Sequence, residues 1–248
     1  MTKIVCISNL EGYLPEELPC GDVLVIAGAS FPFSRILDRN EQLISQVIFW
    51  DSIFRPWLKL QVNIFDKILI TYGYTDLLPY CAYTYRMPDY IAALSKRLIF
   101  PDNVMDITNK TYEYKPKNSD KVIKFFGSPF SFEPAKSNYA FISSEDELSK
   151  SWNCIPKDTE ILVTHEAPLN CSSTFFGSKS LEEVSKSLPL LKYHIYGHSH
   201  YRIRKISNGK TYINCSYTEY APGVLEYENN YTTLKFKPSS SPIETFVY

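Results

Sequence analysis

The sequence predicts a layered α/β fold in which buried strands alternate with helices. Several runs of strand length are almost continuously apolar, rich in Val, Ile and aromatic residues, and bounded by Gly, Pro, Ser or Asn. Strands without polar alternation are typical of sheets that are buried on both faces. Segments with helical apolar spacing separate some of these runs. The predicted strands are Lys3–Ser8, Asp22–Gly28, Lys67–Tyr72, Lys121–Phe126, Glu160–His165 and Lys192–Tyr196.

Three segments between these strands are predicted to be helices. Glu41–Leu60 carries an apolar stripe at helical spacing, and Pro56 is expected to end or kink this helix. Tyr90–Leu98 and Leu181–Leu188 are shorter candidates. Ser180 is expected to cap the last of them, because a serine there precedes two acidic residues of the first turn.

The pattern changes after His200, where short strands follow one another and are expected to pair in antiparallel fashion. Asn208-Gly209 predicts a hairpin turn, because this dipeptide accepts the positive φ that such turns need. The Pro- and Ser-rich end of the chain is expected to be loosely held. We therefore predict one domain over residues 1–237 and a C-terminal tail over 238–248. The expected strands are Arg202–Ile206, Thr211–Cys215, Gly223–Tyr227 and Tyr231–Phe236.

Composition excludes several classes of protein. The 248 residues include 44% hydrophobic residues, enough for one large core, and carry a net charge of −1. Without a basic surplus a dedicated nucleic-acid binder is not expected. No run has the length of a membrane span or the pattern of a signal peptide. The 6 cysteines are scattered and predict reduced thiols, so we expect a cytoplasmic protein without membrane attachment.

Histidines at the ends of predicted strands are the most informative feature. Gly197-His198-Ser199-His200 follows one strand, and His165 follows another. Two histidines separated by one residue at a strand end can point into one pocket, and neutral imidazole is the commonest metal ligand among side chains. The alternative is that they are exposed loop histidines or that they only hold their loops by hydrogen bonds.

These strand-end motifs, in this order, resemble the calcineurin-like metallophosphoesterases. The family pattern is D-x-H, G-D, G-N-H-D, a lone His and G-H-x-H. The resemblance covers Lys3 to about Tyr217, and it is greatest to the small metallophosphoesterase-domain proteins found in brain and in many microbes. It implies a β-sandwich of mixed sheets flanked by helices, with two metals held by loops at strand ends. The corresponding segments are Ile7–Gly12, Ala27–Ser30, Gly73–Asp76, His165 and Gly197–His200.

The chain departs from the family pattern at five positions. Asn9 stands where the family has a metal-binding aspartate, and Glu11 replaces the next histidine ligand. Ala29 replaces the aspartate that bridges both metals and has no donor atom. Tyr74 and Thr75 replace the asparagine and the histidine that serve the second metal and the leaving group. Among the family's ligands only the three histidines remain.

These departures change the charge of the site. Two divalent cations in a low-dielectric pocket repel strongly, and the family's aspartates offset that repulsion. Their replacement removes two negative charges, of which Glu11 could restore one. We therefore expect no metal cofactor. The alternative is one zinc or manganese ion held by the three histidines and Glu11.

The predicted function is that of a pseudoenzyme with a phosphoesterase fold, retained to bind a nucleotide or phosphate or to serve as a scaffold in an assembly with a protein partner. The alternative is an active metal-dependent phosphodiesterase or phosphatase on nucleotide-like esters, with a rebuilt site that uses His165, His198 and His200. The candidate pocket comprises Asn9, Glu11, Ala29, Tyr74, Thr75, His165, His198 and His200.

Three side chains near the motifs have structural interpretations. Tyr74 is expected to fill the space of the metals with its ring. Asp76 is expected to pin its turn, and His194 is expected to be a core histidine with a satisfied hydrogen bond.

Overall fold

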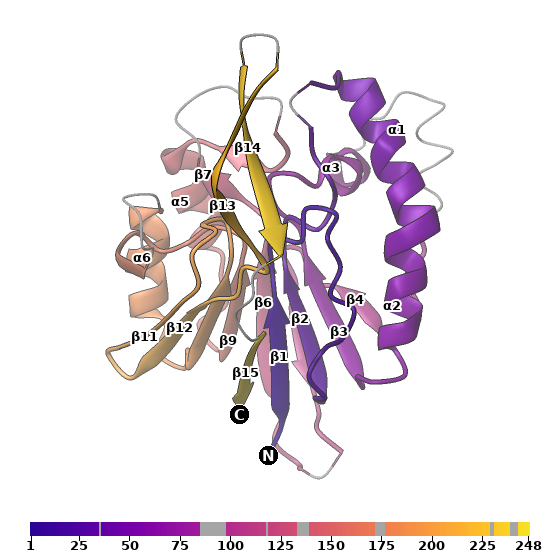
Figure 1. The fold of residues 1–248 in the computed structure, drawn as a ribbon. Helices are drawn as coiled ribbons and strands as arrows, with labels where there is room; N and C mark the ends of the chain where they lie inside the picture. Colours follow the sequence, from indigo (N-terminus) through magenta and orange to yellow (C-terminus); the bar gives the residue numbers. More distant parts are fainter. Residues whose placement is uncertain are drawn as a thin grey trace.

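Two β-sheets pack face to face, and helices cover their outer faces, so the molecule has four layers (Figure 1). The predicted fold class, an α/β sandwich of mixed sheets flanked by helices, is confirmed. The computed structural model describes residues 1–34, 36–84, 98–117, 119–132, 139–171, 177–228, 231–238 and 243–248.

The first sheet has the strand order β15-β1-β2-β3-β4, parallel except for the antiparallel edge strand β15. The parallel strands are buried almost throughout, because both faces of the sheet are covered. Its strands are β1 (Lys3–Ile7), β2 (Val23–Ala27), β3 (Lys67–Thr71), β4 (Val104–Asp106) and β15 (Glu244–Val247).

The second sheet has the order β11-β12-β10-β9-β6-β5, with parallel pairing in its centre and antiparallel pairs at both edges. Its strands are β5 (Thr111–Tyr114), β6 (Ile123–Ser128), β9 (Ile161–Thr164), β10 (Tyr193–Tyr196), β11 (Ile203–Ser207) and β12 (Lys210–Asn214). Two separate pairs complete the described strands: β7 (Ser131–Phe132) with β8 (Ile142–Ser143), and β13 (Thr218–Glu228) with β14 (Tyr231–Pro238).

The helices bury their apolar faces against the outer side of each sheet. Helices α1 (Arg39–Phe49), α2 (Arg55–Gln61) and α3 (Leu77–Thr84) pack on the first sheet. Helices α5 (Glu145–Trp152) and α6 (Lys179–Ser187) pack on the second. A third cluster of apolar side chains, from strands of both sheets, fills the space between them. No helix among the described residues has the length and apolar character to cross a membrane.

The predicted helix over Glu41–Leu60 continues through Pro56. A π-helical turn, Trp50–Phe54, joins α1 to α2, and the N–H of Arg55 donates to the carbonyl of Trp50. Proline lacks an N–H and its ring crowds the carbonyl of the preceding turn. The wider π turn relieves that crowding, so Pro56 lies in the first turn of α2 instead of ending the helix.

Two further expectations were wrong in detail. Helix α6 is capped by Ser178, two residues before the predicted Ser180, because the hydroxyl of Ser178 accepts from the N–H of Leu181. The end of the chain is not loose at Glu244–Val247, which forms β15 beside β1. The predicted helix at Tyr90–Leu98 lies almost wholly outside the described residues.

The predicted hairpin at Asn208-Gly209 is confirmed. It joins the antiparallel strands β11 and β12, and both residues have positive φ, 52° and 71°.

Candidate functional site

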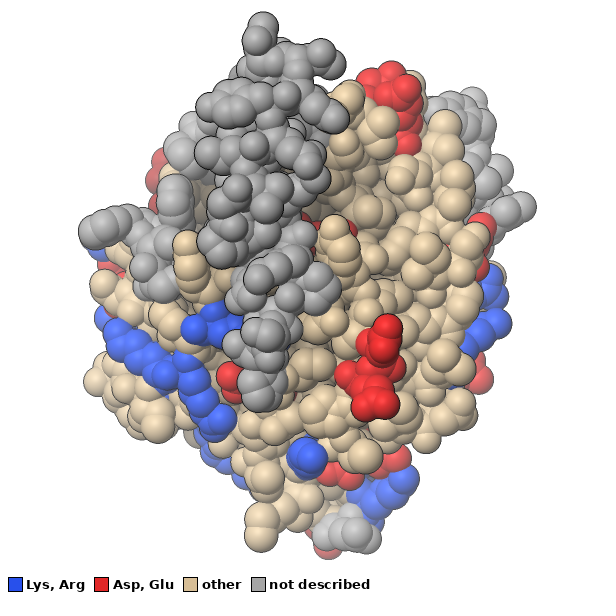
Figure 2. All heavy atoms as spheres, viewed as in Figure 1, with Lys and Arg blue, Asp and Glu red and all other residues tan. Residues whose placement is uncertain are grey.

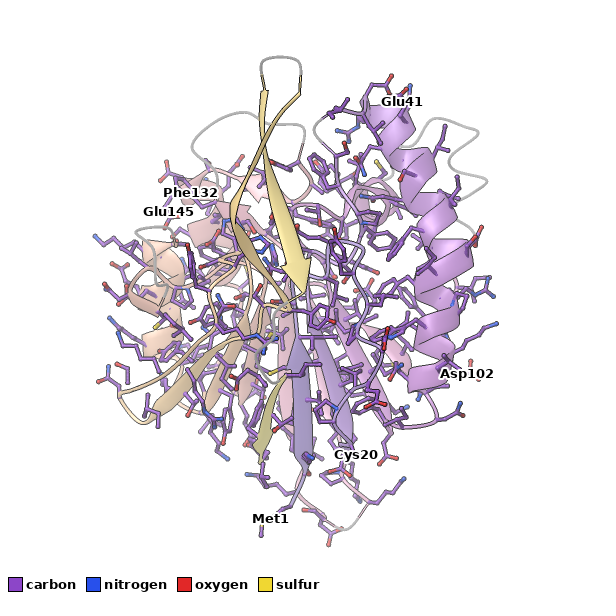
Figure 3. All side chains as sticks on the ribbon, in the orientation of Figure 1. Met1, Cys20, Glu41, Asp102, Phe132 and Glu145 are labelled. Atoms are coloured by element: carbon purple, nitrogen blue, oxygen red, sulfur yellow. The ribbon has the colours of Figure 1, made fainter. Side chains whose placement is uncertain are left out.

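The carboxyl ends of five strands bring all the predicted site residues to one end of the sandwich. Asn9, Glu11 and Ala29 follow β1 and β2, and Tyr74 and Thr75 follow β3. The histidines follow β9 and β10 of the second sheet. Because parallel strands of one sheet end at the same edge, residues far apart in sequence meet here. Figure 3 shows many side chains in the space between the ends of the two sheets.

Asn9 holds the H-x-H loop in place with its amide. Its Oδ1 accepts the N–H of His198 at 3.0 Å and the hydroxyl of Ser8 at 3.1 Å. Its Nδ2 lies 3.2 Å from Nε2 of His200. The Asn9 side chain is fully buried. Both ends of the amide are therefore engaged with the protein, and the nitrogen could not bind a cation in any case.

Glu11 is paired with residues of the site and is not a solvated loop carboxylate. Its Oε1 accepts the hydroxyl of Tyr74 at 2.9 Å and lies 3.2 Å from Nε2 of His200. The other ring nitrogen of His200 lies 3.1 Å from the hydroxyl of Thr218. His200 thus connects three segments: the loop after β1, its own loop and the start of β13.

The ring of Tyr74 packs against two of the three candidate histidines. The centroid of its ring lies 5.3 Å from that of His165 and 5.3 Å from that of His198. The rings of His165 and His198 are 5.4 Å apart in an edge-to-face arrangement. Tyr74 therefore lies beside the imidazoles, and its hydroxyl donates to Glu11. This position agrees with the prediction that its ring fills space in the site.

Ala29 is fully buried at the centre of the site and contributes only a methyl group. Its backbone is left-handed, with φ of 54°, as are those of Asn9, Glu11 and His198 at 50°, 48° and 60°. This conformation is strained for residues other than Gly, Asn and Asp. Such a concentration of left-handed backbones is typical of functional sites. The loops therefore have the backbone shape of a ligand-binding site, although the alanine at position 29 supplies no ligand atom.

Asp76 pins the turns after β2 and β3, as predicted. Its carboxylate accepts the N–H groups of Ser30, Phe31 and Gly73 at 2.8–2.9 Å. Burial nevertheless raises the pKa of Asp76 to about 7. Thr75, beside it, is buried, and its hydroxyl lies 3.4 Å from the same carboxylate. The Thr75 hydroxyl thus contacts the Asp76 carboxylate, which supports a structural role for Thr75.

His165 lies at the bottom of the site and is fully buried. Its Nδ1 lies 3.0 Å from the carbonyl of Ala27. A Cβ at Gly28 would lie 2.7 Å from this Nδ1, and one at Gly73 would lie 2.6 Å from the ring. The two glycines are thus required for the ring to fit. Burial, followed by the nearby His198, holds the pKa of His165 well below its usual range, so the ring is neutral.

Sequence reasoning missed Glu166. This fully buried carboxylate accepts the N–H groups of Phe132 at 2.6 Å and Ala167 at 3.0 Å, and one oxygen lies 4.0 Å from Nε2 of His198. Burial raises its pKa. The only signal in the sequence was its place directly after His165, so the interaction with His198 depends on the tertiary fold.

His194 lies in β10, away from the site and buried in the core, as predicted, but only one of its ring nitrogens has a hydrogen-bond partner among the described residues, because Nδ1 has none. Its Nε2 lies 2.8 Å from the hydroxyl of Thr164, and burial lowers its pKa to about 3.

The donor set does not fit a pair of divalent cations. A two-metal site needs a bridging anionic ligand, and the described residues place alanine at the central position. Oδ1 of Asn9 already accepts the backbone N–H of His198 and the hydroxyl of Ser8, and Oε1 of Glu11 accepts the hydroxyl of Tyr74. Within the part of the chain that the structure describes, no three His, Cys, Asp or Glu side chains are grouped as a metal site.

A cavity of about 600 Å³ lies at the opposite end of the molecule. It is lined by residues that precede strands, among them Thr2, Asp22, Asp66 and Lys192. It therefore does not include any residue of the candidate pocket.

Sequence comparison finds relatives that include a metallophosphoesterase-domain protein. The chain is 26% identical to human metallophosphoesterase domain-containing protein 1 over 235 residues, which cover 87% of this chain and 66% of the human protein. The chain is therefore similar to metallophosphoesterase-domain proteins. It is also 32% identical over 116 residues to the UPF0046 protein K07C11.7 of Caenorhabditis elegans, which is 44% of this chain and 39% of that protein. The chain thus spans only part of the length of these relatives. No family model matches.

Two solved structures share the fold. One, 15% identical, has a TM-score of 0.58 over 87% of this chain and 90% of its own. The other, TT1561 of Thermus thermophilus, is 10% identical and has a TM-score of 0.53 over 96% of this chain and 98% of its own. At this level of identity the likeness concerns the fold alone.

Proposed function

We propose that this metallophosphoesterase-like protein is a pseudoenzyme, which does not hydrolyse phosphoesters by a two-metal mechanism and instead serves as a scaffold for protein assembly. The observation that carries the proposal is the pairing of the site residues with one another. Hydrolysis in this manner needs two cations to activate water and to stabilise both reacting oxygens. Ala29 supplies no bridging ligand, and the carboxylate of Glu11 is held by Tyr74 and His200.

The closed packing of the site favours a scaffold over a pocket for nucleotides. Asn9, Ala29 and His165 are fully buried, and the Tyr74 ring packs on two imidazoles. A nucleotide would have to displace that ring and break its hydrogen bond to Glu11. The buried polar groups of the site link the loops of the first sheet to those of the second by hydrogen bonds. These contacts hold the ends of the two sheets together.

One observation favours a second candidate, a site for a single metal ion such as zinc. Nε2 of His165 and Nδ1 of His198 are buried and have no hydrogen-bond partner among the described residues. Buried ring nitrogens without a partner are uncommon and can mark a ligand that is held there. Two imidazoles alone are fewer protein ligands than zinc usually has.

The test restores the missing charges. The wild-type chain and the variants Asn9→Asp, Ala29→Asp and the double variant are assayed for metal content and for hydrolysis of an aryl phosphodiester with manganese or zinc. We expect neither a stoichiometric metal pair nor turnover in the wild type. We expect the double variant to take up more metal than either single variant, because it regains two anionic ligands; aspartate tolerates the left-handed backbone at position 29.

Wild-type turnover that disappears in His165→Ala would refute the proposal and support the active phosphoesterase. One equivalent of zinc bound without turnover, and lost in His165→Ala, would support the single-metal candidate instead. Calorimetry with inorganic phosphate and nucleoside monophosphates tests the pocket: heat of binding that is lost in His198→Ala would contradict the scaffold proposal.

A further inference from the structure

The cavity at the end of the molecule opposite the candidate site is built by both sheets. Residues within or next to β1, β2, β3 and β15 of the first sheet and β5, β6 and β10 of the second line it. Both termini lie at this end in Figure 1, and Figure 2 shows basic and acidic side chains close together there. The volume of about 600 Å³ lies within the range of pockets that bind small molecules.

Two lysines on one side of the cavity share a single carboxylate. Nζ of Lys121 lies 3.4 Å and Nζ of Lys192 lies 3.3 Å from the same oxygen, Oε1 of Glu160. That oxygen also accepts the hydroxyl of Tyr248 at 2.5 Å. Two ammonium groups are thus matched by one carboxylate, which leaves a positive charge on this side. The Lys121 side chain lowers the pKa of Lys192, as expected for like charges held close together.

Both ammonium groups are accessible to a ligand. The side chains of Lys121 and Lys192 expose 56% and 47% of their surface, whereas Glu160 beneath them exposes only 12%. Their Nζ atoms lie 5.0 Å and 4.5 Å from the ring centroid of Tyr248, a position that attracts cations. Lys192 donates to Glu160 and Tyr248, and an ammonium group has three N–H donors. Within the part of the chain that the structure describes, a donor therefore remains for an anion.

The other side of the cavity is acidic. Oδ1 of Asp66 pairs with Nζ of Lys117, and its Oδ2 accepts the hydroxyl of Tyr114 at 3.5 Å. Asp22 accepts the backbone N–H of Lys3 at 2.7 Å instead of an ammonium group, so it keeps its negative charge. Burial raises the pKa of Tyr114 to about 12, and the carboxylates of Asp66 and Asp22 add to this rise.

The strand order of the first sheet separates the two sides. Tyr248 directly follows β15, and Asp22 directly precedes β2. These strands are the first and third in the order β15-β1-β2, so at about 4.8 Å between neighbours they lie about 10 Å apart. A ligand that matches both sides therefore carries an anionic group at one end and hydrogen-bond donors at the other.

A phosphate monoester with hydroxyl groups meets both requirements. Its phosphate carries nearly two negative charges at neutral pH and three acceptor oxygens, enough to accept from both ammonium groups. Hydroxyl groups donate to carboxylates without adding charge. A ligand with a carboxylate at each end would be repelled by Asp22, and one with a cation at each end would be repelled by the lysines.

We propose that this cavity binds a small phosphate monoester that bears hydroxyl groups, with the phosphate on Lys121 and Lys192 and the hydroxyl groups on Asp22 and Asp66. Sugar phosphates and nucleoside monophosphates share this chemistry. The inference does not rest on the proposed function, because the cavity contains no residue of the candidate pocket.

Calorimetry of the full chain with ribose 5-phosphate, adenosine monophosphate and inorganic phosphate tests the proposal. We expect at least one ester to bind about 10-fold more tightly than inorganic phosphate, because only an ester also reaches the acidic side. The tighter of the two esters identifies the ligand as a sugar phosphate or a nucleotide. Lys192→Met is expected to weaken ester binding about 10-fold or more, because it removes a charged donor.

Two controls locate the binding. Lys124→Met removes a positive charge from the same end of β6, but this lysine pairs with Asp158 and Glu113 and does not line the cavity. It should leave the affinity unchanged, and so should His198→Ala in the candidate pocket. Circular dichroism checks that Lys192→Met stays folded.

Asp22→Asn tests the acidic side separately. Asparagine keeps an acceptor for the N–H of Lys3, so we expect the fold to be retained. The variant should weaken ester binding about 5-fold and leave the affinity for inorganic phosphate unchanged or higher. Failure of both esters to bind, or ester binding that Lys192→Met leaves intact, would overturn the proposal. An equal loss of affinity for ester and inorganic phosphate in Asp22→Asn would do the same. Binding that His198→Ala abolishes would overturn it too and would place the ligand in the candidate pocket, against the scaffold function.

Discussion

At the scale of single residues, the candidate site differs from a two-metal centre by the atoms it lacks and by the hydrogen bonds of those it has. Ala29 keeps a left-handed backbone at the centre of the site but offers only a methyl group. The side-chain oxygen of Asn9 and one carboxylate oxygen of Glu11 already accept hydrogen bonds from their neighbours. Hydrogen bonds between protein groups thus hold these loops in place.

Buried histidines should make the folded protein sensitive to acid. The folded-state pKa of His194 is about 3, far below the value of about 6.5 of an unfolded chain. The unfolded state therefore binds a proton that the folded state does not, and stability is lost as pH falls below about 6.5. We expect His194→Gln to reduce the loss between pH 7 and pH 5 by about 2 kcal/mol.

Urea denaturation of the wild type and of this variant at the two pH values measures the difference. His198→Gln, in which the replaced side chain is partly exposed, serves as the comparison. Equal acid sensitivity of the wild type and His194→Gln would contradict the assignment of a neutral buried His194.

At the scale of elements, helix ends and turns follow local rules, whereas the helix over residues 39–61 does not. The capping box of α1 illustrates the local rule: Oδ1 of Asp38 accepts the N–H groups of Asn40 and Glu41, and Oε2 of Glu41 accepts the N–H of Asp38. Pro56 illustrates the exception. The apolar residues on both sides of it pack into one core, and this packing favours a π turn over a helix end.

Loss of the α1 cap should destabilise the protein by about 1 kcal/mol. In Asp38→Ala two N–H groups of the first turn lose their acceptor. Thermal or urea denaturation measures the change. Asp120→Ala is the matched control, because Asp120 is fully exposed. Its ion pair, 3.7 Å from Nζ of Lys115, lies on the surface, where such pairs contribute little to stability. An effect of the same size in both variants would show that the cap contributes nothing specific.

At the scale of the whole molecule, the two ends of the chain meet in one sheet. Strand β15 pairs with β1, and the N–H of Thr2 donates to the carbonyl of Tyr248 (Figure 1). Phe246 packs into the cluster between the sheets and stacks on Tyr193 with a centroid distance of 4.1 Å. The last residues thus close the apolar layer between the two sheets.

Phe246→Ala should destabilise the protein by about 3 kcal/mol, because it opens a cavity in the core between the sheets. Val247, the next residue, points the other way along the strand and is half exposed. Val247→Ala should therefore change the free energy of unfolding by no more than about 0.5 kcal/mol. Equal losses in the two variants, or none in Phe246→Ala, would show that the chain end does not stabilise the core.

The sequence by itself determined the α/β class, most strands and the place of each site residue. Apolar runs report burial directly, and residues that follow parallel strands must gather at one edge of the sheet. It also determined that position 29 has no ligand atom. Only the tertiary structure decided the partners: Tyr74 with Glu11, His198 near Glu166, β15 beside β1, and the π turn before Pro56. These contacts depend on the packing of segments distant in the chain, which periodicity and spacing do not report.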